Sequence, residues 1–361
     1  MEFDKNKIVE ALRAVMDPQT GVDVIKAKKI SDLTIEGKDL NLTLSVSSLK
    51  SNEKTALTFS CMAAINELYP SLEVHVHAKV KEEKPSSPLS HIKNTIAVAS
   101  GKGGVGKSTM SVNLALSLQK KGFSVGLLDL DLYGPSIPTM LGLQGKKPNM
   151  TDIHGRPKMI PIEKFGLPTM SIGYVISPEQ AVVLRGPRLG GIVKQFIAEC
   201  LWPPLDFLII DLPPGTGDVH LSLVQTIPLS GVVMVTTPQQ VAYDDALKGM
   251  NMFRLENVNV PILGVVENMA WFTPDELPNN KYYIFGKGSG KKLAKEANTV
   301  LLGQVPIHMS ICDDGDQGKP STWSGHDSIQ HIFDSMTNRL IQQVQIRNEM
   351  IAPTQMVDVQ K

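Results

Sequence analysis

The glycine-rich stretch at residues 101–109 carries the most specific chemical signal in the sequence. Its letters, GKGGVGKST, fit both the GxGxxG pattern of dinucleotide-binding loops and the GxxxxGK[ST] pattern of P-loops. Both patterns use glycines so that backbone N–H groups at a helix N-terminus can face a phosphate. Lys107 and Ser108 distinguish the two patterns, because only the P-loop pattern requires them. In nucleoside triphosphate chemistry the lysine ammonium lies near the β- and γ-phosphates and the serine hydroxyl binds Mg²⁺.

Three aspartates that follow apolar runs are candidates for the same site. Asp211 ends the run LDFLIID, where a carboxylate can hold Mg²⁺ or cap a turn; with a P-loop upstream, we favour Mg²⁺. Asp129 also fits the ribose-binding acid of a dinucleotide site, which lies about twenty residues after the loop. Asp131 is the candidate for orienting the attacking water, with capping of the YGPS turn as the alternative. Together these residues favour nucleoside triphosphate hydrolysis over nicotinamide binding.

The elements around these residues alternate between strand and helix. Apolar runs typical of buried parallel strands lie at 95–100, 124–131, 205–211, 231–237 and 261–268. Helical spacing lies at 107–120, 189–199, 243–255 and 329–344. The alternation predicts an α/β fold with a doubly wound, mostly parallel sheet, which binds ligands at the carboxyl ends of its strands.

The chain before this region has a different organisation. Helical spacing at 3–15 and 56–68 and strand alternation at 39–46 and 72–78 indicate a small α+β module. A charged, Pro/Ser-rich segment then follows. The predicted boundaries are a small α+β domain at 1–80, a linker at 81–92, a P-loop ATPase domain at 93–345 and a loose C-terminal tail at 346–361.

Composition limits the classes of partner. The 36 basic and 36 acidic side chains cancel, so no overall charge favours nucleic acid or a membrane surface, and we expect neither as a partner. The three cysteines form no CxxC pair, which argues against a disulfide framework and for a reducing compartment. The N-terminal residues show no signal-peptide pattern, so the expected location is cytoplasmic.

Several motifs together resemble a known family. GKGGVGKS is similar to the deviant Walker A box of MinD, ParA and the nitrogenase iron protein. The segments DLDLYGPSIP, DLPPGTGD, VENMAWF, YYIFGKGSGKKLA and GQVPI then resemble, in order, the Mrp/ApbC family of iron–sulfur cluster carrier ATPases over residues 93–345. The N-terminal module, with LRAVMDPQTGVDVI, resembles the small domain of iron–sulfur assembly factors.

The resemblance implies a homodimer that binds ATP and Mg²⁺ and delivers clusters to apoprotein clients. Lys102, which the residues alone would allow as a surface lysine, would reach across the dimer to the partner's nucleotide, and Lys102, Lys107 and Asp131 would be the catalytic residues. Ser108 and Asp211 would hold Mg²⁺. The implied nucleotide-binding residues are Gly101, Lys102, Gly103, Gly104, Val105, Gly106, Lys107, Ser108, Thr109, Asn268 at the adenine edge and Pro306 at the opposite wall.

The chain departs from this family at its cluster ligands. Members usually carry a CPxC pair after ENM, and two subunits pool these thiolates to hold one [4Fe–4S] cluster. Here Thr273 and Glu276 stand in those positions, so no iron–sulfur ligand is identified. The segment with Asp275 and Glu276 is interpreted as a polar turn, with an oxygen-rich ferrous site as the alternative. The departure keeps open a second function, a nucleotide-switched scaffold or positioning ATPase of the MinD/ParA type without a cluster.

The remaining candidates for chemistry are one thiol and a pair of histidines. Of Cys200 and Cys312, Cys312 in the loop SICDDGD is the better candidate for an exposed thiol, although an ordinary structural role is favoured for it; Cys61 is expected to be buried. His75 and His77 alternate on one predicted strand face. This spacing is compatible with metal binding, but a half-solvated strand face explains it more simply.

Overall fold

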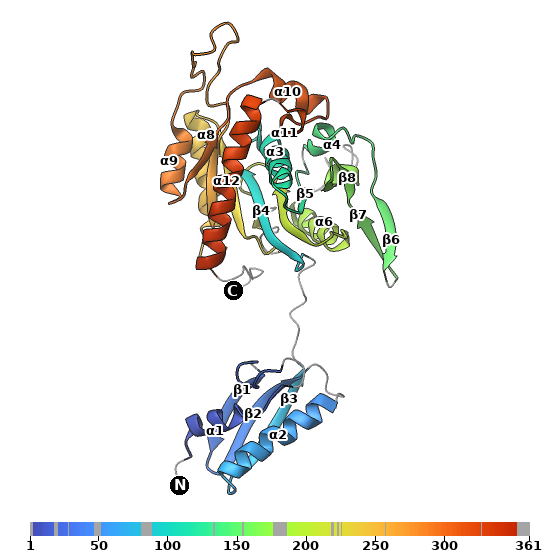
Figure 1. Ribbon diagram of the computed structural model, residues 1–361, viewed down its shortest axis with the longest axis vertical. Coiled ribbons are helices and arrows are strands. Elements are labelled where there is room, and N and C mark those ends of the chain that lie inside the picture. The colour runs from blue at the N-terminus through green and yellow to red at the C-terminus, as the bar shows by residue number, and fades with distance from the viewer. Residues whose placement is uncertain are drawn as a thin grey trace. The chain divides into compact units, whose positions relative to one another are not determined.

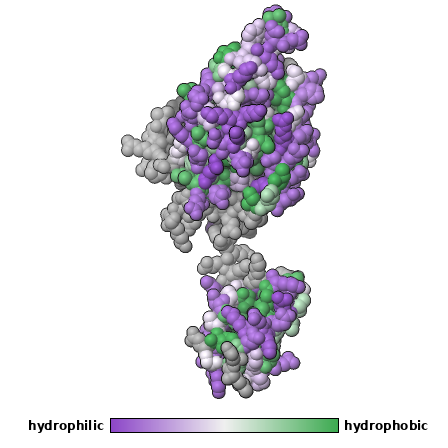
Figure 2. All heavy atoms as spheres, turned by 90° about the vertical axis from the view of Figure 1, so that its left-hand side faces the viewer, coloured by the Kyte–Doolittle hydropathy of each residue, from purple (hydrophilic) through white to green (hydrophobic). Residues whose placement is uncertain are grey.

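The computed structural model describes residues 3–17, 21–27, 29–46, 52–80, 89–132, 134–153, 155–175, 186–217, 220–221, 224, 226–256, 258–325 and 327–351 (Figure 1). The chain divides into two compact units, Met1–Ser86 and Ser87–Lys361, and each has a hydrophobic core of its own. The faces seen in Figure 2 are mostly hydrophilic, in keeping with apolar side chains that gather in these two cores.

The first unit is a three-stranded sheet packed against two helices. Its elements are α1 (Lys5–Leu12), β1 (Ile30–Glu36), β2 (Asp39–Val46), α2 (Asn52–Leu68) and β3 (Glu73–Val80), with strand order β1-β2-β3. Strand β2 pairs antiparallel with β1 and parallel with β3. Alternation buries Leu40, Leu42 and Leu44 in the core shared with the helices, so the intervening polar residues lie on the opposite face.

Strand β1 was not predicted from the sequence. Its residues ISDLTIE lack clean alternation, because the pairing with β2 shifts register between Ser31 and Thr34. Asp32, inside the shift, has a φ of 52°. A bulge of this kind breaks the period-two pattern on which a sequence-based strand prediction depends.

The second unit contains an eight-stranded sheet in the order β13-β12-β11-β4-β10-β5-β9-β8. Every pairing is parallel except that of β8 with β9, so the predicted doubly wound, mostly parallel fold class is confirmed. The strands are β4 (Ile92–Ser100), β5 (Val125–Asp129), β8 (Ile162–Lys164), β9 (Leu167–Ser171), β10 (Leu205–Asp211), β11 (Gly231–Thr236), β12 (Ile262–Glu267) and β13 (Leu301–Gln304). A separate hairpin joins β6 (Asn149–Ile153) and β7 (Arg156–Ile160).

Helices cover both faces of this sheet. Helix α3 packs on β4, β5 and β10 beside α12, while α8 and α9 pack on β11, β4 and β12. The helices are α3 (Lys107–Lys120), α4 (Ile137–Met140), α6 (Gly186–Glu199), α8 (Gln240–Phe253), α9 (Ser289–Glu296), α10 (Met309–Asp316), α11 (Ser321–Ser324) and α12 (Asp327–Met350), with a 3₁₀ turn η1 (Ile172–Tyr174). The central strands β4, β5 and β10 are almost wholly buried, as their unbroken apolar runs predict.

The structure differs from the predicted boundaries at both ends of the second unit. Strand β4 begins at Ile92, and Leu89 is already buried in the core, so the predicted linker at 81–92 extends too far. Helix α12 continues to Met350, into the predicted loose tail at 346–361. Its last turn is held because Arg347 is buried and Asn348 donates to the Asn94 side chain at 2.9 Å. Residues 352–361 of that tail lie outside the described residues.

Helix α12 closes the core beside α3 and β13, and Phe333 is its largest fully buried side chain. We expect Phe333→Ala to lower the free energy of unfolding of the second unit by about 3–5 kcal/mol, because it removes buried apolar volume and leaves a cavity. The exposed Asn338→Ala on the same helix is the matched control and should change it by less than about 0.5 kcal/mol. Urea denaturation followed by circular dichroism measures both; equal effects would contradict this account of the core.

Candidate functional site

The glycine-rich loop joins the central strand β4 to α3, and its backbone shape requires glycine. Gly104 and Gly106 have φ values of 78° and 85°, which side chains with a Cβ rarely adopt. A Cβ on Gly101 would lie 2.1 Å from the backbone carbonyl carbon of Asp245 in α8. The path of the loop therefore requires glycine at positions 101, 104 and 106.

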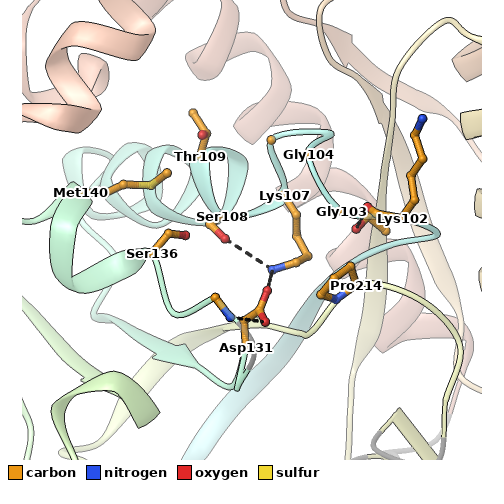
Figure 3. Close-up of a pocket in the computed structure, with 13 residues that line it drawn as sticks. Lys102, Gly103, Gly104, Lys107, Ser108, Thr109, Asp131, Ser136, Met140 and Pro214 are labelled. Carbon is orange, nitrogen blue, oxygen red and sulfur yellow. Dashed lines mark hydrogen bonds and ion pairs between the residues drawn. The ribbon is translucent and has the colours of Figure 1, made fainter. Parts of the chain in front are cut away.

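The N-terminus of α3 is open to a ligand. Its N-cap is Gly106, which has no side chain to accept the first-turn N–H groups. These donors and the helix dipole favour a bound anion such as a phosphate. A cavity of about 390 Å³ lies against them, lined by Ser100, Lys102, Gly103, Gly104, Gly106, Lys107, Ser108, Thr109, Asp131, Gly134, Ser136, Met140 and Pro214 (Figure 3).

Lys107 lies in a buried cluster of carboxylates at the end of the sheet. Its Nζ lies 2.8 Å from Asp211 Oδ2 and 3.3 Å from Asp131 Oδ2. Ser108 Oγ donates to Asp211 Oδ2 at 2.6 Å, and Ser111 Oγ donates to Oδ1 at 2.6 Å. The structure thus brings together the predicted lysine, the predicted hydroxyl and two predicted carboxylates.

Asp129 joins this cluster from the neighbouring strand. The pairing of β5 with β10 places Asp129 opposite Asp211. Both side chains are fully buried; Asp129 accepts the Asp131 N–H at 3.0 Å and the Ser171 hydroxyl at 2.9 Å. Burial raises the pKa of Asp129, and the nearby Asp211 raises it further.

The charges of this cluster fit a divalent cation. Burial also raises the pKa of Asp211, although Lys107 acts in the opposite direction. Three carboxyl groups therefore surround one lysine in a site with little exposure to water, and Asp129 keeps its proton to higher pH than an exposed aspartate does. Mg²⁺ prefers oxygen ligands, and the carboxylates and the Ser108 hydroxyl supply them. The residues present thus fit a magnesium ion beside a phosphate.

Asp131 and Lys102 lie on different sides of the cavity. Asp131 accepts the Gly134 N–H at 3.2 Å and so caps the YGPS turn, the alternative role predicted for it. It also forms an ion pair with Lys107. Figure 3 shows the Lys102 side chain directed away from this pair. Within the described part of the chain Lys102 makes no ion pair, unlike Lys107.

A second cavity of about 430 Å³ adjoins the first and shares three lining residues with it, Gly106, Thr109 and Met140. Asn268 and Pro306, the two residues predicted to flank an adenine, both line it. The Asn268 amide also donates to the Val105 carbonyl at 2.8 Å. Space for a base therefore lies directly beside the phosphate cavity.

His220 is a buried residue near the site that sequence reasoning missed. Its Nε2 lies 2.8 Å from the Pro213 carbonyl, in the turn after Asp211. Burial lowers the pKa of His220, so the ring is neutral and Nε2 donates to that carbonyl. Nothing in the local pattern marks this histidine; only its place nine residues after Asp211 could have suggested it.

The positions of the family cysteines carry no thiol. Thr273 is half-buried and Glu276 is exposed. Burial raises the pKa of Cys61 to about 11 and also raises the pKa of Cys200, so both thiols are protonated. Cys312 is exposed as predicted, but it lies in α10 rather than in a loop, where it faces Asp316 Oδ2 at 3.9 Å. His308 caps that helix, which a loop interpretation of SICDDGD overlooked.

Comparison with known families identifies the two parts of the chain. The family described as NUBPL iron-transfer P-loop NTPase matches residues 91–341, and an iron-sulfur cluster assembly protein family matches residues 5–76. The chain belongs to the iron-transfer P-loop NTPase family. The predicted family resemblance, including that of the N-terminal module, is confirmed.

Curated relatives match most of the length of this chain. An iron-sulfur cluster carrier protein of Synechocystis sp. is 41% identical over 318 residues, which are 87% of this chain and 90% of the relative. The carrier protein of Escherichia coli strain K12 is 46% identical over 77% of this chain and 74% of its own. The iron-sulfur cluster transfer protein NUBPL of Dictyostelium discoideum is 39% identical over 82% of this chain and 92% of its own.

Solved structures also resemble this chain over about two thirds of its length. A nucleotide-binding protein of Archaeoglobus fulgidus, in complex with ADP, has a TM-score of 0.57 and 33% identity, over 69% of this chain and 97% of its own. The cell division ATPase MinD of Pyrococcus furiosus has a TM-score of 0.50 and 19% identity, over 69% of this chain and 99% of its own. The second likeness is one of fold. Among the described residues, no helix is long and apolar enough to cross a membrane.

The raised pKa of Asp129 gives a test of the charge cluster. The folded protein holds this carboxyl proton to higher pH than the unfolded chain does. The free-energy cost of burying Asp129 therefore grows as the pH rises above 3.8, the ordinary pKa of an aspartate. We expect Asp129→Asn to stabilise the nucleotide-free protein by about 1 kcal/mol at pH 8 and by less at pH 5. Thermal melts with a chelator present measure this difference.

Asp206→Asn is the control of opposite sign. The Lys93 ammonium and the Ser124 N–H and hydroxyl lower the pKa of Asp206 to about 2. Its stabilising effect is present above the ordinary pKa, so removing the charge should lower the melting temperature at both pH values. An Asp129→Asn variant that is less stable than the wild type at pH 8 would contradict the cluster as described.

Proposed function

We propose that this chain is a homodimeric, Mg²⁺-dependent ATPase that takes part in the transfer of iron–sulfur clusters to apoproteins. One observation carries the proposal: Lys107 and Ser108 of a P-loop meet Asp211 within hydrogen-bonding distance, in a chain of the iron-transfer NTPase family. The relatives in Synechocystis and Escherichia coli are named iron-sulfur cluster carrier proteins, which supports an iron–sulfur cluster as the cargo. The three free cysteines suit a reducing compartment such as the cytoplasm.

The residues of the phosphate cavity would divide the work of hydrolysis. Lys107 and the loop N–H groups would hold the phosphates, and Asp131 would orient the attacking water from the edge of the cavity. Ser108 and Asp211 would hold Mg²⁺, which neutralises charge on the phosphates when it is bound. Asn268 and Pro306 would flank adenine in the second cavity.

Lys102 would complete the site of the partner subunit. Its side chain lines the cavity, is half-buried, and points away from the Lys107 cluster of its own subunit (Figure 3). A cation supplied in trans would stabilise negative charge that develops in the neighbouring site, as an arginine finger does elsewhere. Nucleotide binding would then draw two subunits together, and hydrolysis would release them.

The cluster itself would be cargo held partly by thiolates from outside the chain. Four soft sulfur ligands suit a [4Fe–4S] cluster, whereas this chain offers one exposed thiol, Cys312, per subunit. Two subunits supply two such thiols at most. The missing ligands would come from a client protein or a small thiol. A positioning ATPase without a cluster, the alternative from sequence, receives less support because the relatives are named carriers.

The lysine of the P-loop can be tested by substitution. We expect Lys107→Ala to lower the turnover of Mg-ATP by at least about a hundredfold, because it removes a buried cation next to the phosphates. Lys146→Ala, at an exposed position outside the cavity, is the control and should keep wild-type turnover. Phosphate release measures both. Unchanged turnover in Lys107→Ala would remove the P-loop lysine from the mechanism.

Mixed dimers test whether Lys102 acts in trans. Lys102→Ala and Asp131→Asn should each be inactive alone. A mixed dimer would hold one intact site, built from Asp131 of the first variant and Lys102 of the second. Random exchange at equal amounts makes about half of the dimers mixed, so about a quarter of wild-type activity should return. If mixing restores nothing while both variants bind ATP and form dimers, Lys102 acts within its own subunit.

Anaerobic reconstitution tests the source of the cluster ligands. With iron and sulfide, we expect the protein to hold a cluster only when an external thiol is added, because its own exposed thiols are too few. Visible absorption with iron and sulfide counts is the measurement. A cluster that forms without added thiol and is lost in Cys312→Ser would assign the ligands to the chain itself and contradict this part of the proposal.

A further inference from the structure

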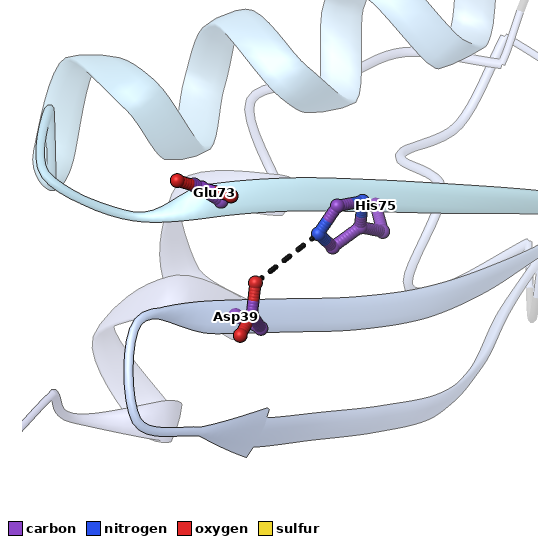
Figure 4. A group of neighbouring side chains, drawn as sticks. All are labelled: Asp39, Glu73 and His75. Atoms are coloured by element: carbon purple, nitrogen blue, oxygen red, sulfur yellow. Dashed lines mark hydrogen bonds and ion pairs between the residues drawn. The ribbon is translucent and has the colours of Figure 1, made fainter.

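The exposed face of the sheet in the first unit carries a group of possible metal ligands. Asp39 on β2 and Glu73 and His75 on β3 each offer one ligand atom, and all three atoms lie within 4.8 Å of one another. His75 Nε2 lies 3.3 Å from Asp39 Oδ1 (Figure 4). This group lies in a different unit from the nucleotide cavities.

The strand pattern holds these side chains in place. Strands β2 and β3 pair in parallel with Asp39 opposite Glu73, and His75 follows on the same face two residues later. The alternate residues Leu40, Leu42 and Leu44 are fully buried on the other face and anchor β2 to the core. The three possible ligands therefore project from paired strands, which orient side chains more firmly than a loop does.

The charges of this group favour a cation. Asp39 and Glu73 stand directly opposite each other on neighbouring strands, a placement that destabilises a sheet when both residues carry the same charge. Within the described part of the chain, no lysine or arginine forms an ion pair with either carboxylate; the recorded partner of Asp39 is His75. A divalent ion would cancel two negative charges and leave the imidazole neutral, as a metal ligand must be.

We propose that Asp39, Glu73 and His75 form a binding site for a divalent first-row transition-metal ion. In a tetrahedral site with bonds of about 2.1 Å, neighbouring ligand atoms lie about 3.4 Å apart, close to the distance between His75 Nε2 and Asp39 Oδ1. An imidazole nitrogen selects transition ions over Mg²⁺ and Ca²⁺, which prefer oxygen alone. Three protein ligands on an exposed face leave at least one position for water or for a ligand from another molecule, so the ion is exchangeable.

The neighbouring His77 provides a matched control. It lies two residues after His75 on the same face, is also exposed, and its Nε2 lies 3.4 Å from Asn41 Oδ1. His77 is not part of the group whose atoms lie within 4.8 Å. Replacing it changes the exposed face to a similar degree but leaves the three proposed ligands intact.

Titration of the full-length, tag-free protein with Co²⁺ tests the proposal. Millimolar Mg²⁺ occupies the P-loop site, and a Cys312→Ser background removes the exposed thiol as a competing ligand. We expect one Co²⁺ per chain with visible d–d absorption, binding weakened at least about tenfold by His75→Ala or Asp39→Asn, and unchanged binding in His77→Ala. Circular dichroism confirms that each variant is folded.

Two outcomes would overturn the site. One is a wild-type protein that gives no saturable Co²⁺ absorption. The other is a folded His75→Ala variant that binds Co²⁺ with wild-type affinity and stoichiometry. Because the readout is metal binding in the first unit, failure here leaves the ATPase proposal untouched, and loss of ATPase activity in Lys107→Ala leaves this site untouched.

Discussion

The buried pairing of Lys107 with Asp211 is the interaction on which the rest of the second unit's site depends. Three carboxylates reach one end of the sheet because β5 and β10 are in register and the chain turns directly after β5. A single buried lysine offsets them. Breaking a buried ion pair by removing one partner costs about 3–5 kcal/mol, because the remaining charge stays in a medium of low polarity. Lys107 faces both Asp131 and Asp211, so even with Asp129 protonated the carboxylates outnumber the lysine, and a cation bound beside them would balance the charge.

The P-loop is also tied to the ends of two further strands. The Asn268 amide, just after β12, donates to the Val105 carbonyl, and a Cβ on Gly106 would lie 2.2 Å from that amide nitrogen. On the other side, the Gly215 N–H donates to the Ser100 carbonyl at 3.0 Å. A phosphate bound to the loop would therefore be one hydrogen bond away from the turn after Asp211 and from Asn268. Each contact is a single hydrogen bond because the loop follows β4, a central strand of the sheet.

Sequence reasoning recovered the parts of the site that follow from local pattern. The helix predicted at 107–120 and the strand predicted at 205–211 have the same ends in the structure. The glycine loop marks the start of the helix, and the unbroken apolar run marks the extent of the strand. The role of Ser111 could not be predicted, because its contact with Asp211 joins positions 100 residues apart in sequence. The β6–β7 hairpin and strands β8 and β9 were also missed. All four strands are short and lack a clear period; β6, β7 and β8 are partly exposed, whereas β9 is mostly buried.

The segment after β12 connects the nucleotide cavities to Thr273 and Glu276, the two positions where the family resemblance implies a CPxC pair. Met269 has a φ of 53°, a costly conformation for a residue with a side chain, which is sustained by hydrogen bonds on both sides. The Asn268 N–H donates to Thr236, and the Ala270 N–H donates to Val305. Further along, the backbone of residues 271–282 pairs with itself and with residue 307. Adenine between Asn268 and Pro306 would touch both ends of this framework. These contacts join Asn268 to Thr273 and Glu276 through a short hydrogen-bonded framework, and under the proposed function nucleotide binding would act through it on the surface offered to a client's thiolates.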